Sequence, residues 1–373
     1  MTPLDGLLVL DFSTLLPGPM ATLLLAEAGA EVVKIERPGG GDEMRGYRPR
    51  WGSDSAGFAL LNRGKRSIVL DLKEEAGRAR LAPLLARADV LVEQFRPGVM
   101  ERLGLGYDAV AAGNPRLIYC SITGYGQTGP KRGVAGHDLN YIAAAGLLAL
   151  GHGDAAHPVV PPALIADIAG GAYPAVMNIL LALMRRAATG QGCRLDISMT
   201  DNLFPFLYWA LGQGAATGAW PGNGTDLVTG GTPRYRLYPA ADGRIIAVAA
   251  IEDRFWAAFC EAVGLEPALR DDARDPGATA RRIGALIAAR PSADWREVLA
   301  RADCCCSVMA TPAEALADPQ FAARFLFARR VGNGGGDVMP ALPVPLDPAF
   351  RTPESAPPPA APRLGADNGR YLR

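Results

Sequence analysis

The feature that most constrains the fold of this chain is an alternation of short apolar runs with helix-length amphipathic stretches through its first 200 residues. The apolar runs are continuous and rich in Val, Ile and Leu, as strands buried on both faces are. Repeated strand–helix alternation of this kind predicts an α/β protein whose parallel sheet is covered by helices on both faces. The predicted strands are 7–12, 31–35, 67–72, 90–93, 117–122 and 194–198, and the predicted helices are 18–28, 74–88, 96–103 and 107–114.

Neither of two common nucleotide-binding motifs accompanies this pattern. The turn after the first predicted strand, 13–19 (STLLPGP), contains no G-x-G-x-x-G, and the glycine run 39–42 (GGGD) is not followed by GK[ST]. In an open parallel sheet the ligand normally binds outside the carboxyl ends of the strands, at a point where the strand order reverses. The ligand site is therefore expected at that edge, without a dinucleotide fingerprint.

The length of 373 residues predicts two or three domains. After position 222 the pattern changes to a hairpin signal (235–238, a turn at 241–243, and 245–249), followed by helical stretches at 254–263, 279–289, 292–301 and 312–316. Beyond Gly332 prolines alternate with apolar residues, which favours an extended segment lying over the first domain. The expected division is a large Rossmann-like domain (1–200), a linker (201–225), a small α+β domain (226–320) and a returning C-terminal segment (321–373).

Composition excludes several classes of protein. The chain has 38 Lys+Arg and 38 Asp+Glu, and this zero net charge argues against a general nucleic-acid binder. We expect no membrane span, because no apolar run reaches about 18 residues, and no signal peptide, because the N-terminus lacks a basic leader. The six cysteines have no CxxC spacing, which favours buried thiols in a reducing cytoplasm and no metal site, although the role of the run 304–306 stays open.

Three polar residues stand out as candidates for chemistry. His137 precedes an apolar helix, where a lone histidine is more often structural than functional. Asp167 directly precedes a long apolar helix and suits an N-cap; however, Gly170 and Gly171 would also let a ligand approach the helix start and its positive dipole. Glu252 ends an apolar strand, and by itself it is expected to be solvated.

Basic residues form a further set beside predicted strand ends and glycine-rich turns. Such residues are ordinarily solvated, but here their placement suits an anionic ligand with phosphates. They are Arg37, the run 62–66 (NRGKR), Arg96 and the pair 131–132.

The chain resembles the family III CoA-transferases together with alpha-methylacyl-CoA racemase, which share one fold. The matching stretches cover nearly the whole chain in order: 17–19 (PGP), 29–38 (GAEVVKIERP), 62–73 (NRGKRSIVLDLK), 96–98 (RPG), 124–130 (GYGQTGP), 136–138 (GHD), 166–167 (AD), 190–192 (GQG) and 362–367 (PRLGAD).

The resemblance implies an enzyme of two domains in an interlocked homodimer, with an acyl-CoA substrate lying across the large domain. It implies no metal or redox cofactor and neither a nucleic-acid nor a membrane partner. The residues expected to contact coenzyme A are Arg37, Asn62, Arg63, Lys65, Arg66, Arg96, Tyr125, Gly126 and Lys131.

His137, Asp167 and Glu252 match the racemase positions, in which the His and Asp are the two acid/base groups and the Glu lies near the His. This match favours racemisation or epimerisation of a 2-methylacyl-CoA. In the characterised transferases the Asp is instead a nucleophile and the His position usually differs, so a CoA-transferase acting through Asp167 is the alternative. A CoA- or nucleotide-binding regulator ranks last, because it has no reason to bring these three residues together.

Overall fold

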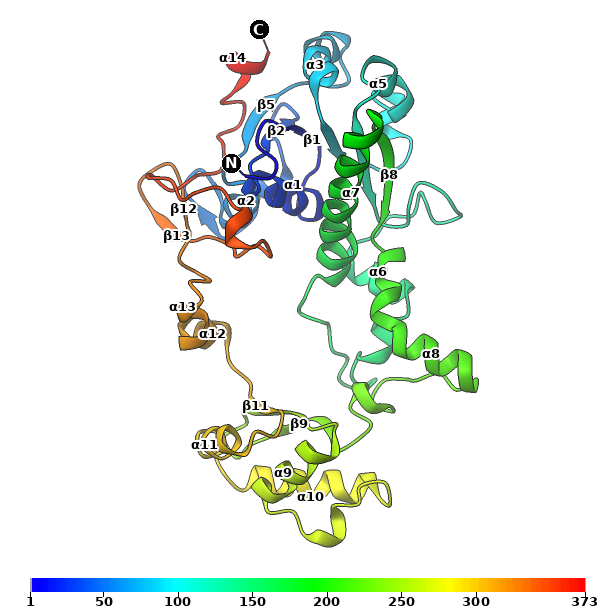
Figure 1. Cartoon of the computed structure of the whole chain (residues 1–373), viewed down its shortest axis with the longest axis vertical. Helices are drawn as coiled ribbons and strands as arrows, with labels where there is room; N and C mark the ends of the chain where they lie inside the picture. The colour runs from blue at the N-terminus through cyan, green and yellow to red at the C-terminus, as the bar shows by residue number, and fades with distance from the viewer. Residues whose placement is uncertain (1, 373) are drawn as a thin grey trace. The chain divides into compact units, whose positions relative to one another are not determined.

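The computed structural model describes residues 2–372, and the chain divides into two compact units (Figure 1). Unit 1 comprises Met1–Ala145, Ala163–Pro205 and Pro319–Arg373, and unit 2 comprises Gly146–Pro162 and Phe206–Asp318. The segment 146–162, expected in the large domain, thus belongs to unit 2. The expected linker 201–225 spans the boundary between the two units at Pro205 and Phe206, and it contains α8 (Tyr208–Thr217).

Unit 1 is built on a six-stranded sheet whose order is β5-β2-β1-β6-β7-β8 and whose strands are all parallel. All six predicted strands are present in it, and the sheet reverses its direction of growth between β1 and β6. The carboxyl ends of these two central strands therefore form the switch point at which a ligand is expected. The strands are β1 (Leu8–Asp11), β2 (Glu31–Glu36), β5 (Arg66–Val69), β6 (Val90–Glu93), β7 (Ile118–Thr123) and β8 (Cys193–Ser198).

Helices pack on both faces of this sheet. Alternate side chains of β1 point to opposite faces, and Leu8 and Leu10 join a core with Leu81 and Leu84 of α3 (Glu75–Arg87). Helices α1 (Pro17–Glu27) and α7 (Tyr173–Thr189) contact each other and the sheet strands. The other helices of unit 1 are α2 (Ala56–Asn62), α4 (Val99–Arg102), α5 (Tyr107–Gly113), α6 (Asp138–Ala144), α13 (Pro319–Ala323) and α14 (Asn368–Tyr371).

The C-terminal segment packs on the outer edge of β5. The Asp367 carboxylate accepts the backbone N–H of Ser67 at 2.9 Å, and the Asn368 side chain accepts that of Val69 at 2.8 Å. These bonds occupy edge donors that an uncovered strand would present to another chain. Unit 1 also contains two small hairpins, β3 (Arg50–Trp51) with β4 (Asp54–Ser55), and β12 (Arg330–Gly332) with β13 (Val338–Pro340).

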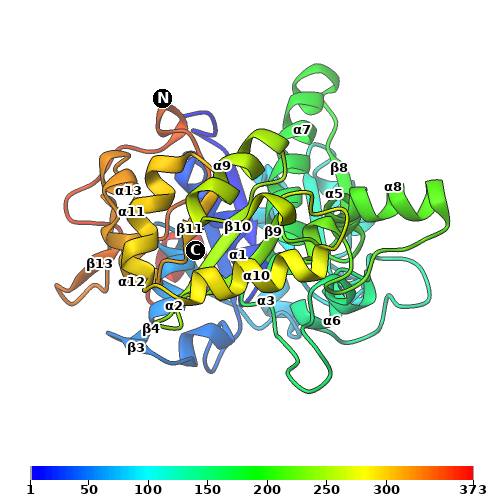
Figure 2. The ribbon, with the colours of Figure 1, turned by 90° about the horizontal axis from the view of Figure 1, so that it is seen from below.

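Unit 2 contains an antiparallel sheet of order β11-β10-β9, shown with its surrounding helices in Figure 2. The predicted hairpin is β9 (Tyr235–Pro239) with β10 (Ile245–Ala249), whereas β11 (Cys306–Val308) was not foreseen. Phe259 and Trp295 are buried in its core. The helices are α9 (Asp253–Val263), α10 (Pro276–Ala288), α11 (Ser292–Ala302) and α12 (Pro312–Ala317), besides α8.

One helical stretch, Ala166–Thr189, is long and apolar enough to cross a membrane by length and composition, contrary to the expectation that no such run exists. It includes α7, which contacts α1, β7 and β8. Arg186 in its last turns is buried and pairs with Asp89 at 2.9 Å. These contacts are those of a core helix in unit 1.

Candidate active site

A cavity of about 410 Å³ opens at the carboxyl ends of the central strands of unit 1. The loop after β1 contributes Leu15 and Pro17, and the loop after β6 contributes Gln94 to Pro97. The end of β7 and the chain after it contribute 122–125, Arg132 and 134–137, and α6 contributes Asn140 and Tyr141. Asp167 and Met199 complete the lining. The cavity therefore lies at the switch point that the strand order defines.

His137 lies in this cavity, directly before α6. Its backbone N–H donates to the Asn140 side chain at 3.0 Å, and its carbonyl accepts the N–H of Asn140 at 2.8 Å. The residue is exposed, so its ring is open to the cavity and to water. These two hydrogen bonds hold the backbone of His137 in place, and neither of them uses a nitrogen of the imidazole ring.

Asp167 lines the same cavity from the first turn of a π-helical segment, Ala166–Ala172, which continues into α7. It is not the N-cap residue that its place in the sequence suggested. Its backbone N–H donates to the carboxylate of Asp138 at 2.9 Å, and Asp138 is the buried residue that follows His137. Asp138 thus ties the start of this helix to the Gly-His-Asp loop and sets His137 and Asp167 in one wall.

The Asp167 carboxylate is half-buried and has no hydrogen bond or ion pair with any residue in the described range 2–372. Burial, together with the neighbouring charge of Asp138, raises its pKa to about 6, and His137 opposes the rise. A carboxyl group with a pKa near neutrality can exchange a proton under physiological conditions, as a general acid or base must.

Gly170 and Gly171 serve packing rather than ligand approach. A Cβ at Gly170 would lie 2.4 Å from the carbonyl oxygen of Met199, and one at Gly171 would lie 3.2 Å from Pro17 and 3.0 Å from the Met199 side chain. The two glycines let the π-helical segment approach the end of β8 closely. This close approach places Asp167 at the cavity.

Glu252 belongs to unit 2, where it is the N-cap residue of α9 and is exposed. Its carbonyl accepts the N–H of Trp256 at 2.9 Å, whereas its carboxylate makes no capping hydrogen bond to the start of the helix. Its expected pairing with His137 stays a prediction.

Comparison with known proteins agrees with this arrangement. The family model described as CoA-transferase family III matches residues 4–368. An acetyl-CoA:oxalate CoA-transferase from Acetobacter aceti is 36% identical over 100% of this chain and 95% of its own length. An alpha-methylacyl-CoA racemase from Mus musculus is 37% identical over 84% of this chain and 79% of its own. The chain belongs to CoA-transferase family III.

Solved structures share its fold over nearly the whole chain. The orthorhombic form of Rv3272 from Mycobacterium tuberculosis superposes with a TM-score of 0.85 at 27% identity, covering 100% of this chain and 99% of that one. A CAIB/BAIF family protein from Brucella suis gives 0.80 at 29% identity, covering 99% and 98%. By name, the relatives of this family III chain in the preceding paragraph include both a CoA-transferase and a racemase.

Several of the coenzyme A contacts expected of a family III enzyme lie at the carboxyl edge of the sheet. Arg96 and Tyr125 line the cavity, and the Lys131 ammonium lies 5.6 Å from the centre of the Tyr125 ring. Gly126 follows with a φ of +81°, which favours glycine. Arg37 directly follows β2, is exposed, and pairs with Glu43 at 2.9 Å.

The structure argues against the expected contacts of Asn62 and Lys65 with coenzyme A, because both side chains are buried inside unit 1. The Lys65 ammonium donates to Asn62, Thr22 and the Pro19 carbonyl and lies 3.1 Å from the Asp11 carboxylate. Burial lowers the Lys65 pKa to about 8, although Asp11 opposes this shift. With its protons already bonded, Lys65 has none to offer a phosphate.

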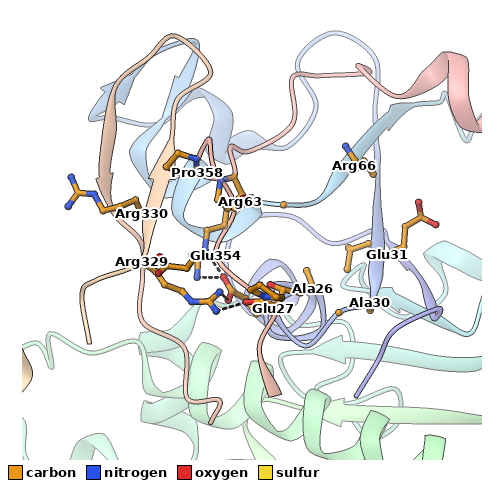
Figure 3. A pocket seen from close by; sticks show the side chains of 17 residues that line it. Ala26, Glu27, Ala30, Glu31, Arg63, Arg66, Arg329, Arg330, Glu354 and Pro358 are labelled. Carbon is orange, nitrogen blue, oxygen red and sulfur yellow. Dashed lines mark hydrogen bonds and ion pairs between the residues drawn. The ribbon is translucent and has the colours of Figure 1, made fainter. Parts of the chain in front are cut away.

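Arg63 and Arg66 are also removed from the expected contacts. Arg63 is buried and bonds Glu27, and both arginines line a second cavity away from His137 and Asp167 (Figure 3). Arg66 begins β5 and therefore lies at its amino end, opposite the edge that carries the candidate active site. Although Arg63 and Arg66 are close in the sequence, Arg63 is a buried structural residue and Arg66 lies at the surface.

Sequence reasoning missed residues that position the site. Asp138 and Tyr141 were visible within or beside the Gly-His-Asp motif; the Tyr141 hydroxyl donates to the Gly136 carbonyl at 2.5 Å. Burial, with the Asp167 charge, raises the Tyr141 pKa to about 12, so this hydroxyl keeps its proton.

A buried network under the loop after β1 gave no sequence signal. The Lys34 ammonium pairs with Asp42 at 2.9 Å and donates to the Ser13 carbonyl at 2.6 Å. Asp42 also accepts the N–H of Leu15, which has a φ of +62° despite its side chain. This network holds a strained residue in the cavity wall.

Proposed function

We propose that this chain is an acyl-CoA racemase or epimerase that acts on a 2-methylacyl-CoA thioester through His137 and Asp167. The observation that carries the proposal is that both residues line one cavity at the switch point of the sheet. Inverting the carbon next to a thioester requires one group to remove its proton and another to return a proton to the opposite face.

An imidazole and a carboxyl group whose pKa lies near neutrality suit this exchange. Burial raises the pKa of Asp167 to about 6, and histidine commonly serves as a general acid or base in enzymes. Either group can therefore be the base while the other is the acid, so that each configuration of the α-carbon can be converted into the other. In this proposal Glu252 orients the imidazole of His137 and stabilises its charged form.

The enolate formed between the two proton transfers carries its charge on the thioester oxygen. The first amides of the Asp167 helix do not serve it, because the N–H of Asp167 donates to Asp138 and that of Ile168 to Leu164. Arg96 lines the cavity, and its guanidinium is the group we assign to this oxygen. No metal or redox cofactor is needed for this chemistry.

A CoA-transferase is the second candidate, favoured by the unpaired carboxylate of Asp167 and by the full-length match to a transferase. Here the carboxylate attacks the acyl-CoA carbonyl and expels CoA thiolate, which leaves a mixed anhydride. The thiolate then attacks the Asp167 carbonyl, forming an enzyme thioester and releasing the acid. An acceptor carboxylate reverses these two steps, so that CoA leaves on the acceptor and the Asp167 carboxylate is restored.

Incubation of a 2-methylacyl-CoA in deuterium oxide separates the two. Deuterium at the α-carbon without an added acid supports the racemase, and a new thioester that appears only with an acceptor acid supports the transferase. His137→Ala should abolish deuterium incorporation, whereas His157→Ala, a change at an exposed histidine of unit 2, should not. Incorporation that survives His137→Ala contradicts the proposed acid/base pair.

We also propose that the enzyme is a cytoplasmic homodimer. Helix α7 of unit 1 exposes an apolar stripe of Met177, Leu181 and Met184, which are 57%, 57% and 71% exposed. Their spacing places all three on one face of the helix. A second copy of the chain is the cover that we infer for this face.

A further inference from the structure

The second cavity, of about 470 Å³, lies at the opposite edge of the unit 1 sheet from the candidate active site (Figure 3). Its walls come from the end of α1 and the start of β2 (26–27 and 29–32), from Arg63, Gly64 and Arg66, and from the returning C-terminal segment. Because β2 and β5 enter the sheet here, the cavity is separate from the lining of His137 and Asp167.

The floor of this cavity carries more positive than negative charge. One carboxylate, that of Glu27, pairs with Arg63 at 2.8 Å, Arg329 at 3.0 Å and Arg351 at 2.9 Å. A single negative charge cannot balance three guanidinium groups. Glu27 alone therefore leaves two positive charges of its buried cluster unbalanced, and the rim adds Arg66 and Arg330 against the exposed Glu354.

Arg63 is repelled by the other two arginines of this cluster. Burial lowers the pKa of its guanidinium, Glu27 opposes the shift, and repulsion from Arg351 and Arg329 adds to it. An anion placed in the cavity would reduce this repulsion. A bound anion would be stabilised by guanidinium groups that the fold already holds close together.

Donors remain available at the cavity rim. The Arg66 guanidinium is half-exposed, and its nearest carboxylate, Asp367, is 4.0 Å away. Arg330 is exposed, with one long bond of 3.4 Å to the Val338 carbonyl. Of the other carboxylates in the lining, Glu31 is paired with Arg370 at 2.6 Å, and Glu354 stands exposed above Glu27.

We propose that this cavity is a binding site for a small dianion, of the phosphate or dicarboxylate class, held by Arg66 and Arg330 over the Glu27 arginine cluster. Such a ligand would join the returning C-terminal segment to the start of the sheet, since the cavity draws walls from both. The site is independent of the reaction proposed above.

Calorimetric titration of the full chain with sodium phosphate, and separately with disodium succinate, tests the proposal at constant ionic strength set with sodium chloride. At least one probe should bind, and the arm that binds identifies the ligand class. Arg66→Gln with Arg330→Gln should weaken that binding at least tenfold. The matched pair Arg87→Gln with Arg301→Gln, at exposed arginines elsewhere, should leave it unchanged.

A second variant distinguishes loss of the binding site from misfolding of the chain. Glu354→Gln removes a negative charge from the rim and should tighten binding several-fold, which a damaged fold cannot do. The proposal is overturned if neither probe binds, or if Arg66→Gln with Arg330→Gln binds as the unmodified chain does. It is also overturned if Arg96→Gln with Arg132→Gln, in the other cavity, is the pair that abolishes binding.

Discussion

Asp167 is a carboxyl group held where its charge is costly. Its pKa in the folded chain is about 6, raised by burial and by Asp138, against an ordinary value of 3.8. The contribution of this group to stability is present below the unfolded pKa and is lost as pH rises through about 6, because folding then requires a buried charge. The reactive form is thus the less stable one.

Asp167→Asn should therefore stabilise the fold while abolishing turnover. With the screening of a partly exposed site allowed for, we expect a gain of about 1–2 kcal/mol in the free energy of unfolding at pH 8. The gain should shrink below pH 6 and vanish near pH 3, where the unmodified carboxyl group is protonated in both the folded and the unfolded state. Chemical denaturation at the three pH values measures it, and a loss of stability at pH 8 would contradict the assigned pKa shift.

The sequence predicted the two cavity residues His137 and Asp167 but misassigned several basic ones. His137 and Asp167 were found because their motifs are local and rigidly spaced. Lys65 and Arg63 stand in an equally recognisable motif, yet their partners, Asp11 and Glu27, come from distant positions. Whether a charged side chain is buried depends on such distant partners, which local sequence patterns do not reveal.

At the scale of elements, the placement of Asp167 depends on how closely its helix approaches the end of β8. Gly170→Ala should destabilise the chain by about 1–3 kcal/mol, because the new methyl group meets the Met199 carbonyl at 2.4 Å. Turnover should fall with it, since the helix start moves.

Gly212→Ala is the matched control in α8. Apart from the neighbouring backbone of α8, no atom lies within 4 Å of the position that its new methyl group would take, so this change should be neutral or stabilising by up to about 1 kcal/mol. Thermal unfolding and turnover of both variants provide the measurement. Equal behaviour of the two variants would contradict the packing argument.

The returning C-terminal segment is attached to α1 by charge. Glu27→Gln leaves Arg63, Arg329 and Arg351 without a countercharge, and we expect a loss of about 3–5 kcal/mol. Glu297→Gln, in the exposed pair with Arg301, should cost under about 1 kcal/mol. Denaturant unfolding compares them, and a small loss in both would show that the Glu27 cluster contributes little.

Most of the elements could be predicted, because continuous apolar strands and amphipathic helices leave local patterns. All six strands of the parallel sheet and the hairpin of unit 2 were found in this way. The short strands β3, β4, β11, β12 and β13 were not, since two or three residues carry no periodicity. Which unit the segment 146–162 joins is likewise set by tertiary contacts.

At the scale of the whole molecule, the exposed stripe on α7 leads to a test of assembly. The 39.2 kDa chain should behave in solution with twice that mass. Met177→Glu with Met184→Glu should weaken the assembly, because charges would have to be buried at the contact. Light scattering coupled to size exclusion measures both. A monomeric native chain, or an unaffected variant, would contradict the proposed interface.

The bonds between Asp367 and Ser67 also bear on how the protein is made. They join positions 300 residues apart, so β5 keeps an open edge until Asp367 has left the ribosome. At ordinary synthesis rates of about 5–20 residues per second, that interval is roughly 15–60 s. During that time the unpaired edge of β5 could pair with another chain, and we expect a chaperone to protect it.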